Sequence, residues 1–440
     1  MVGEFTKNTF FSLTQKTLSV FFKVLATIII ARQLGPENQG LFTLALFLPS
    51  LLLIFLTGGI SFATIFYLGK RKYSIKEAMT GNFFFFLIFS FFAIFLSFFV
   101  IFFWGEKLFP GAAKNFFYLA LLLIPPSCFL DYFSGILLGL KRIRENALLS
   151  FLVDFLNFLF VFILIFLLPF KIKAAILSQF LSLFFAVFYL FYLLRKELKG
   201  FSLKLQINYL KDTFLYGLKS HLSAIFTLLH YRIDHFLINI FLNPLSVGFY
   251  SIATRAAEGF WFFSYALVNV FFPTIVSQSD DFKKKFTPLV FRQSIFLFFF
   301  LFSFLFLFSP FLVNLLFSKD YLPSVLSLRI LLFGTFFISL WRILSQDIFA
   351  RGLPMVNVKI SLFSLISNIV FNLIFIPRFG LEGAAWASSL SYSLMFFFTL
   401  IFYLRISKNK LKDIFLPNKN DFYFYQRLFS FLKEKIFFKN

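Results

Sequence analysis

Residues 81–104 read GNFFFFLIFSFFAIFLSFFVIFFW, a continuous apolar run without a charged side chain. As an α-helix, a run of this length crosses the roughly 30 Å hydrocarbon core of a bilayer, which needs about 20 apolar residues. Similar runs recur along the chain, which is 60% hydrophobic and only 14% charged, against about 25% charged residues in a soluble protein. The sequence therefore predicts an integral membrane protein. A β-barrel is excluded, because barrel strands alternate apolar and polar residues.

The apolar runs predict an all-α polytopic membrane protein with about twelve transmembrane helices. The expected spans are 9–32, 41–68, 81–104, 114–139, 147–168, 174–194, 213–241, 247–276, 289–313, 325–349, 356–376 and 384–404. The connections are short, and the longest, 195–212, is too small for a soluble catalytic domain. We therefore expect no enzyme activity.

The distribution of basic residues predicts the orientation. Counted on alternate sides of the spans, Lys and Arg number 27 on the side of the termini and seven on the other. The positive-inside rule then places both termini in the cytoplasm, for a multi-pass protein of the cytoplasmic (inner) membrane. The first run carries Lys16 and Lys23 and is too long for a signal peptide, so we expect it to be retained.

An internal repeat divides the chain. Leu34–Ala45 aligns with Leu242–Ala253 at a constant offset of 208, with Leu, Pro, Gly and Ala at matching places. We predict two pseudo-symmetric six-helix bundles, residues 1–200 and 201–404, around a central cavity, as in transporters whose halves rock about a central site. Residues 405–440 form a basic cytoplasmic tail, which either lies on the anionic leaflet or is poorly structured.

Polar side chains at helical spacing interrupt several spans. Charges at the bilayer centre cost at least about 2.5 to 3.5 kcal/mol, so these side chains should face a bundle interior or a water-filled cavity. Basic groups predominate, and they predict a cavity that binds an anionic substrate through charge-assisted hydrogen bonds. The expected binding residues are Lys23, Arg232, Arg255, Arg342 and His235.

These cations have alternative interpretations. Lys23 and Arg232 could form structural ion pairs between helices, and Arg255 could pair with Glu258 one turn later. The candidate ion-coupling acids are Asp154, Asp234 and Asp347.

Metal and cofactor sites are not expected. The single Cys128 excludes a disulfide within the chain, and all three histidines lie on one span, where they cannot converge on one ion. The net charge of +23 reads as a topology signal between spans, so we expect no nucleic-acid partner.

Four segments support a family resemblance: Ala31–Phe42, Tyr231–Asp234, Val247–Ala253 and Gly380–Ala385. In these segments the sequence resembles polysaccharide biosynthesis and export proteins, the Wzx-type lipid-linked oligosaccharide flippases. They share a superfamily with lipid II flippases and MATE multidrug exporters. The resemblance implies alternating access that moves a polyprenyl-pyrophosphate-linked oligosaccharide from the cytoplasmic to the outer leaflet for cell-surface polysaccharide synthesis. The implied partners are this glycolipid, membrane lipids and a polysaccharide polymerase or glycosyltransferases.

Two other functions in the superfamily stay open. A lipid II flippase usually has two further helices, which the chain does not show. An ion-coupled, MATE-like exporter of small molecules would need an acid such as Asp154 or Asp347 at its centre.

Overall fold

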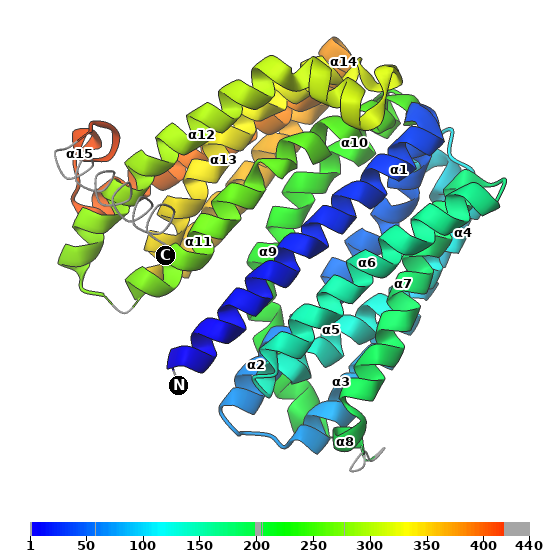
Figure 1. Ribbon diagram of the computed structural model, residues 1–440, viewed down its shortest axis with the longest axis horizontal. Helices are drawn as coiled ribbons and strands as arrows, with labels where there is room; N and C mark the ends of the chain where they lie inside the picture. The colour runs from blue at the N-terminus through cyan, green and yellow to red at the C-terminus, as the bar shows by residue number, and fades with distance from the viewer. Residues whose placement is uncertain (1, 58, 199–203, 205, 277, 418–440) are drawn as a thin grey trace, which may run out of the picture. The chain divides into compact units, whose positions relative to one another are not determined.

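A computed structural model describes residues 2–57, 59–198, 204, 206–276 and 278–417 (Figure 1). These residues form α-helices and two short 3-10 turns, which confirms the predicted all-α class. The helices are α1 (Val2–Thr57), α2 (Ile60–Gly69), α3 (Ile75–Leu108), α4 (Lys114–Ala120), η1 (Leu121–Leu123), α5 (Ile124–Gly139), α6 (Ile143–Leu167), α7 (Lys171–Leu193), α8 (Arg195–Leu198), α9 (Ile207–Phe241), α10 (Pro244–Gly259), α11 (Trp261–Val276), α12 (Asp280–Phe317), η2 (Lys319–Tyr321), α13 (Ser324–Ala350), α14 (Pro354–Ser407) and α15 (Leu411–Phe415). Most of the predicted basic tail lies outside the described residues.

Nine helical stretches in the described ranges are long and apolar enough to cross a membrane. Two of them are unusually long, because α1 and α14 each continue through a bend. Gly35 in α1 has φ 71° and Gly380 in α14 has φ 60°. Both values lie in the left-handed region that glycine adopts without strain. α14 covers two of the predicted spans, and α1 covers the first span and most of the second. The total of twelve crossings stays a prediction.

The chain forms two compact units. Unit 1 comprises residues 1–252 and 314–322, and unit 2 comprises residues 253–313 and 323–440. The predicted division at residue 200 into two six-helix bundles stays a prediction.

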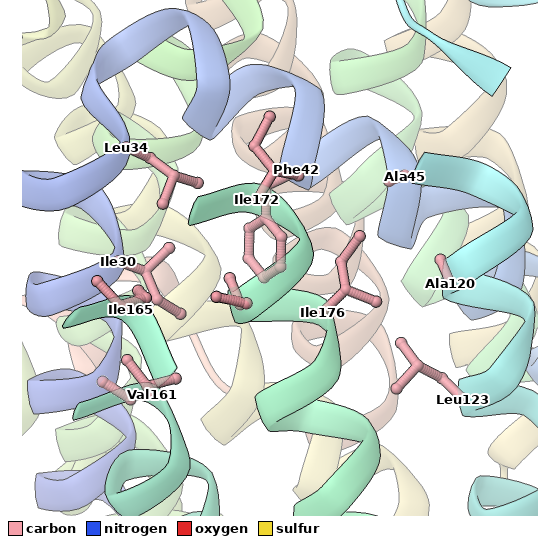
Figure 2. Close-up of a cluster of buried hydrophobic side chains, with 13 residues drawn as sticks. Ile30, Leu34, Phe42, Ala45, Ala120, Leu123, Val161, Ile165, Ile172 and Ile176 are labelled. Carbon is pink, nitrogen blue, oxygen red and sulfur yellow. The ribbon is translucent and has the colours of Figure 1, made fainter. Parts of the chain in front are cut away.

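The core of unit 1 lies between α1, α4, α6 and α7. Figure 2 shows Ile30 and Leu34 of α1 close to Val161 and Ile165 of α6, with Ile172 and Ile176 of α7 beside Phe42. The buried members are Ala26, Ile30, Leu34, Phe42, Ala45, Ala120, Leu123, Val161, Ile165, Ile172, Ala174, Ala175 and Ile176. Small residues among them allow the helices to approach closely, as is typical of helix packing in membranes.

The core of unit 2 is more aromatic. Phe260, Phe291, Phe298 and Phe396 are nearly inaccessible, and Tyr403 is completely buried. Other phenylalanines face outward: Phe91 is 72% exposed and Phe300 is 70% exposed. Exposed apolar surface of this kind suits lipid, where it carries no hydration penalty.

Within unit 1, α1 and α10 cross at two glycines that the sequence repeat relates. A Cβ on Gly40 would lie 1.8 Å from the Pro244 carbonyl oxygen, and a Cβ on Gly248 would lie 1.8 Å from the Pro36 carbonyl oxygen. Both pairs match at the offset of 208, so the contact is reciprocal. Only glycine allows the two backbones to approach this closely.

Candidate functional site

Lys23 lies on α1 and is exposed, one turn from the buried Ser19. The Ser19 hydroxyl donates to Asp154 Oδ2 of α6 over 2.7 Å, and the Asp154 carboxylate interacts electrostatically with Lys23. The structure thus brings together one predicted cation and one predicted acid of unit 1. This electrostatic interaction is consistent with the alternative in which Lys23 stabilises helix packing, while the exposure of Lys23 leaves its ammonium group accessible.

Asp234 and His235 occupy neighbouring positions on α9. Both are buried, at 2% and 3% exposure. Tyr250 of α10 joins them: its hydroxyl donates to Asp234 Oδ2 over 2.8 Å, and its ring meets the His235 ring edge to face at 5.3 Å. Arg232, two residues before Asp234, is half-buried on the same helix.

Arg342 of α13 lies in an aromatic clamp formed by α11. Its guanidinium stands 3.9 Å from the centre of the Tyr265 ring and 4.7 Å from that of Trp261. It donates to the Ser264 hydroxyl over 2.7 Å and to the Tyr265 hydroxyl over 3.2 Å. Arg342 is only 4% exposed. We name Trp261, Ser264, Tyr265 and Arg342 the arginine clamp.

The partners of Arg342 are neutral groups. Within the described ranges, its hydrogen bonds and ion pairs include no carboxylate. A positive charge held in a span by rings and hydroxyls keeps its attraction for an anion, because no negative group compensates it. Such a guanidinium is suited to phosphate or acidic-sugar oxygens.

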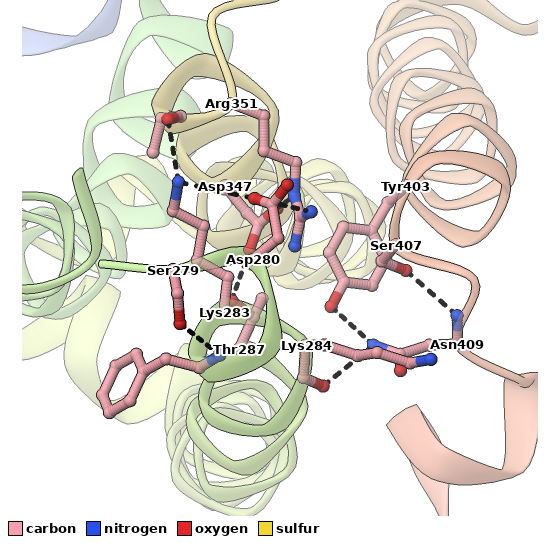
Figure 3. A network of polar contacts seen from close by, with 12 residues as sticks. Ser279, Asp280, Lys283, Lys284, Thr287, Asp347, Arg351, Tyr403, Ser407 and Asn409 are labelled. Carbon is pink, nitrogen blue, oxygen red and sulfur yellow. Dashed lines mark hydrogen bonds and ion pairs between the residues drawn. The ribbon is translucent and has the colours of Figure 1, made fainter. Parts of the chain in front are cut away.

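Asp347, near the end of α13, lies in a different network (Figure 3). It accepts from Thr287 of α12 and is paired with Arg351, which also reaches Asp280 at 3.3 Å. Although burial opposes the charged form, the hydrogen bond and charge of Asp347 raise the pKa of Arg351. Asp347 thus ties the end of α13 to α12, and its role as an ion-coupling acid stays a prediction.

The same end of unit 2 is secured by backbone carbonyls. Lys283 Nζ donates to the Ala350 carbonyl over 3.2 Å, and Asn409 Nδ2 donates to the Lys284 carbonyl over 3.1 Å and the Tyr403 hydroxyl over 3.0 Å (Figure 3). Arg255, the remaining predicted cation, is half-buried on the part of α10 that belongs to unit 2.

Sequence reasoning missed a buried polar cluster in unit 1 that joins α2, α3 and α9. The Tyr209 hydroxyl donates to Asn82 Oδ1 over 2.8 Å and lies 2.9 Å from the Thr64 hydroxyl. Asn82 Nδ2 donates to the Tyr132 carbonyl over 2.8 Å. Asn82 was overlooked because it begins the most apolar run of the chain, where no spacing pattern marks it.

A second missed cluster lies at the start of α9. Asp212 accepts from Lys72 Nζ and from the Tyr73 hydroxyl, each over 2.6 Å. Burial, together with the hydrogen bond to Asp212, raises the pKa of Tyr73 to about 12. Lys72, a basic loop residue that the sequence analysis counted only as a topology signal, therefore also connects the loop between α2 and α3 to α9.

The structure thus places Lys23 within electrostatic reach of Asp154, links Asp234 to His235 through Tyr250, and places Arg342 in the arginine clamp. Lys23, Arg232, Asp154, Asp234 and His235 belong to unit 1, whereas Arg255, Arg342 and Asp347 belong to unit 2. Helices with an apolar exterior and charged groups within their spans define a polytopic membrane protein of the transporter class.

Comparison with known families identifies the chain more closely. Residues 5–279 match the family described as polysaccharide biosynthesis protein, and residues 236–423 match that described as lipid II flippase MurJ. The chain belongs to the polysaccharide biosynthesis protein family, which confirms the predicted resemblance. The families that it matches consist of transporters and flippases, not enzymes.

Two curated relatives are similar in part. The capsular polysaccharide biosynthesis protein CapF of Staphylococcus aureus is 27% identical over 216 residues, which cover 47% of this chain and 54% of that protein. The probable low-salt glycan biosynthesis flippase Agl15 of Haloferax volcanii is 26% identical over 187 residues, which cover 42% of this chain and 40% of that protein. The chain therefore spans about half the length of the curated relatives it matches.

Solved structures share the fold over nearly the whole chain. The lipid II flippase MurJ in an inward closed conformation has a TM-score of 0.72 at 17% identity, covering 93% of this chain and 89% of that one. An inward-facing multidrug resistance MATE family transporter of the MOP superfamily has a TM-score of 0.71 at 18% identity, covering 91% and 99%. At these identities the likeness concerns the fold alone.

Proposed function

We propose that the chain is a flippase that moves a polyprenyl-pyrophosphate-linked oligosaccharide from the cytoplasmic to the outer leaflet by alternating access. Family membership supports a polysaccharide precursor as substrate. The relative Agl15 is described as a probable flippase of low-salt glycan biosynthesis. The observation that carries the proposal is the arginine clamp, where a buried guanidinium meets only neutral partners among the described residues.

In this proposal the cationic residues hold the acidic head group while the polyprenyl tail stays in lipid. Lys23 and Arg232 are the proposed binding residues of unit 1, and Arg255 and Arg342 are those of unit 2. His235 adds a further polar contact. Binding in each conformation has to be weak enough for release on the far side, since a ligand shifts conformations only by its differential affinity.

We also propose that Asp154, Asp234 or Asp347 couples transport to an ion. The protein would lie in the cytoplasmic membrane with both termini in the cytoplasm. A polysaccharide polymerase or glycosyltransferases would receive or supply the glycolipid. Maleimide labelling of single cysteines introduced at Tyr73 and Ala112, which follow α2 and α3, tests the orientation: an impermeant reagent added outside cells should label only the second.

A second candidate is a lipid II flippase, because residues 236–423 match that family. Its substrate has the same polyprenyl-pyrophosphate chemistry, so the same cations would bind it. The two functions differ in the sugar, which decides the design of the test.

The test is leaflet transfer in proteoliposomes with three fluorescent substrates: a polyprenyl-pyrophosphate oligosaccharide, lipid II and a lipophilic cationic dye. Transfer of the oligosaccharide lipid that falls in Lys23→Gln, Arg232→Gln and Arg342→Gln supports the proposal. Preferred transfer of lipid II favours the second candidate. Movement of the dye alone would refute both and indicate a MATE-like exporter.

A matched control lies on the same helix as Arg342. Arg329 stands 5.1 Å from the centre of the Phe306 ring and donates to the Ser309 hydroxyl over 3.0 Å, so it too has aromatic and hydroxyl partners. Because Arg329 is not among the proposed binding residues, Arg329→Gln should transfer the substrate at the wild-type rate. An equal loss in both variants would mean that the effect is structural.

A further inference from the structure

A break between α1 and α2 lies within one of the predicted spans. α1 ends at Thr57 and α2 begins at Ile60, with Gly59 between them at φ 68°. A Cβ on Gly59 would lie 2.5 Å from the Gly217 carbonyl oxygen and 3.0 Å from the Cβ of His221. The break therefore packs directly against α9, and His221 stands beside it.

His221 has one occupied and one open ring nitrogen. Its Nε2 lies 2.8 Å from the carbonyl oxygen of Ile54, in the last turn of α1. A carbonyl can only accept, so Nε2 holds a hydrogen. Its Nδ1 is buried and has no hydrogen-bond partner within the described ranges, and the residue is 8% exposed. In the neutral ring, Nδ1 is thus the atom that can take a proton.

Asp131 of α5 provides the countercharge. Its carboxylate interacts electrostatically with His221. The Ser61 hydroxyl, just after the break, lies 3.0 Å from Asp131 Oδ2 and 2.6 Å from the Asp131 carbonyl oxygen. Gly135 permits this contact, since a Cβ there would lie 2.9 Å from Ser61 Cα. Packing of α5 on α2 therefore fixes Asp131 next to the break.

The position of Asp131 indicates access from water. It lies eight residues before Gly139, the end of α5, or about 12 Å along the helix axis. A carboxylate at that depth does not face lipid, so its exposed surface indicates a hydrated approach. Broken helices at this depth are where transporters commonly bind coupling ions.

We propose that His221 and Asp131 form a proton-binding site at the α1–α2 break. A proton from water adds to His221 Nδ1, and no other bond changes. The imidazolium then keeps its Nε2 hydrogen on the Ile54 carbonyl, at the negative end of the α1 dipole, and interacts electrostatically with the Asp131 carboxylate.

Other titratable groups surround the pair. Cys128 and Tyr132, on the same helix as Asp131, interact electrostatically with it. Tyr216, on α9 before His221, stacks on Phe66 of α2 at 4.4 Å. A thiol and phenols stay neutral near pH 7 in their usual state, so histidine is the group suited to change charge between pH 5 and 8.

The coupling role rests on the proposed flippase function. Protonation changes the charge beside a helix break, and a change in charge that differs between inward and outward states biases their populations. We infer that a proton gradient drives glycolipid transfer through this site.

Proton binding can be measured without transport. The chain has three histidines, so ring-¹⁵N-histidine labelling of the purified protein gives three imidazoles to follow by NMR, assigned with His221→Gln and His230→Gln. The glutamine at 221 keeps a hydrogen-bond donor for the Ile54 carbonyl. We expect the His221 ring to change its protonation state between pH 5 and 8, with a midpoint that shifts in Asp131→Asn.

His230→Gln is the matched control, because His230 is a buried imidazole on the same helix; it should leave the His221 titration unchanged. A His221 ring that keeps one protonation state from pH 5 to 8 would overturn the site, whatever the protein transports. A midpoint that does not respond to Asp131→Asn would overturn the pairing.

Coupling is then tested in proteoliposomes. An imposed pH gradient should accelerate glycolipid transfer severalfold in the wild type and in His230→Gln, but not in His221→Gln or Asp131→Asn, which should keep the slower transfer seen without a gradient. Acceleration that survives in both site variants would refute the coupling. Titration of His221 in a protein that transfers no glycolipid would support the proton site and refute the flippase function.

Discussion

Replacing Gly248 by alanine places a methyl group in the contact between α1 and α10. The new Cβ would lie 1.8 Å from the Pro36 carbonyl oxygen and 2.7 Å from its carbon. These atoms belong to a backbone and not to the end of a flexible side chain, so they cannot move aside alone. The helices would have to separate.

Two opposing terms set the magnitude. Overpacking costs about 1 to 3 kcal/mol, occasionally more, whereas alanine in a helix interior gains about 1 kcal/mol over glycine. Because the clash is with backbone atoms, the cost should lie in the upper part of that range, and the net destabilisation should be about 1 to 2 kcal/mol. For a unit of the size of unit 1 this corresponds to a fall in Tm of roughly 2 to 4 °C. Gly40→Ala should have a similar effect through the reciprocal contact with Pro244. The double variant should lose less than the sum, because both changes open one interface.

The chain contains its own reporter of unfolding. Cys128 is the only cysteine and is fully buried, so a thiol-reactive fluorogenic dye in detergent should react with it only as the protein unfolds. Gly259→Ala is the matched control on the same helix, because a Cβ there has no heavy atom within 4 Å. That variant should keep the wild-type Tm or exceed it slightly.

Equal Tm values for wild type, Gly248→Ala and Gly259→Ala would contradict the reciprocal packing. A fall in Gly259→Ala as large as that in Gly248→Ala would show that any alanine weakens α10. The first outcome would show that α1 and α10 do not cross as closely as described, and the second that the loss in Gly248→Ala does not come from that crossing.

The remaining predictions concern Arg342, Asn82 and Asp212. Arg342→Met should keep or raise Tm, because an apolar side chain avoids the cost of a buried charge. The same variant should lower glycolipid transfer about tenfold or more, since hydrogen bonds to charged groups are worth about 1.5 to 3 kcal/mol. Transfer at the wild-type rate would contradict the binding role of Arg342. Asn82→Ala should lower the stability by about 2 kcal/mol, because it removes the buried hydrogen bonds that Asn82 makes with the Tyr209 hydroxyl and the Tyr132 carbonyl, and an unchanged Tm in the dye assay would refute this. The hydrogen bond from Lys72 lowers the pKa of Asp212, so its stabilisation is present above about pH 4 and is lost as the pH falls through the lower folded-state pKa. The Tm of the wild type, followed by tryptophan fluorescence, should therefore fall more between pH 6 and 3 than that of Asp212→Asn, and parallel curves would rule out the contribution.

Hydropathy and charge alone predicted the all-helical membrane class, because the cost of burying a charge in lipid acts on each segment separately. The four resembling segments were enough to predict the family. The prediction of one continuous helix over 41–68 was wrong, because the helix breaks between Thr57 and Ile60. Gly59 takes a left-handed conformation there, which hydropathy does not reveal.

The candidate site was only partly accessible from the sequence. Spacing placed Arg342 and Tyr265 on polar stripes of different spans, but it did not reveal that they meet, or that Trp261 and Ser264 complete the clamp. Asn82 and Ser61 gave no signal, because a single polar residue in an apolar run has the same local pattern whether it faces lipid or a partner.

The sequence by itself determined that the chain is helical, that it spans a membrane and which family it belongs to, because these properties depend on composition and short-range order. Only the tertiary structure decided the surroundings of the intramembrane polar groups: aromatic rings and hydroxyls around Arg342, Asp154 within electrostatic reach of Lys23, and Asp131 within electrostatic reach of His221. The physical reason is that a contact between helices depends on their relative rotation and depth. Packing across many residues sets both quantities, and no single segment encodes them.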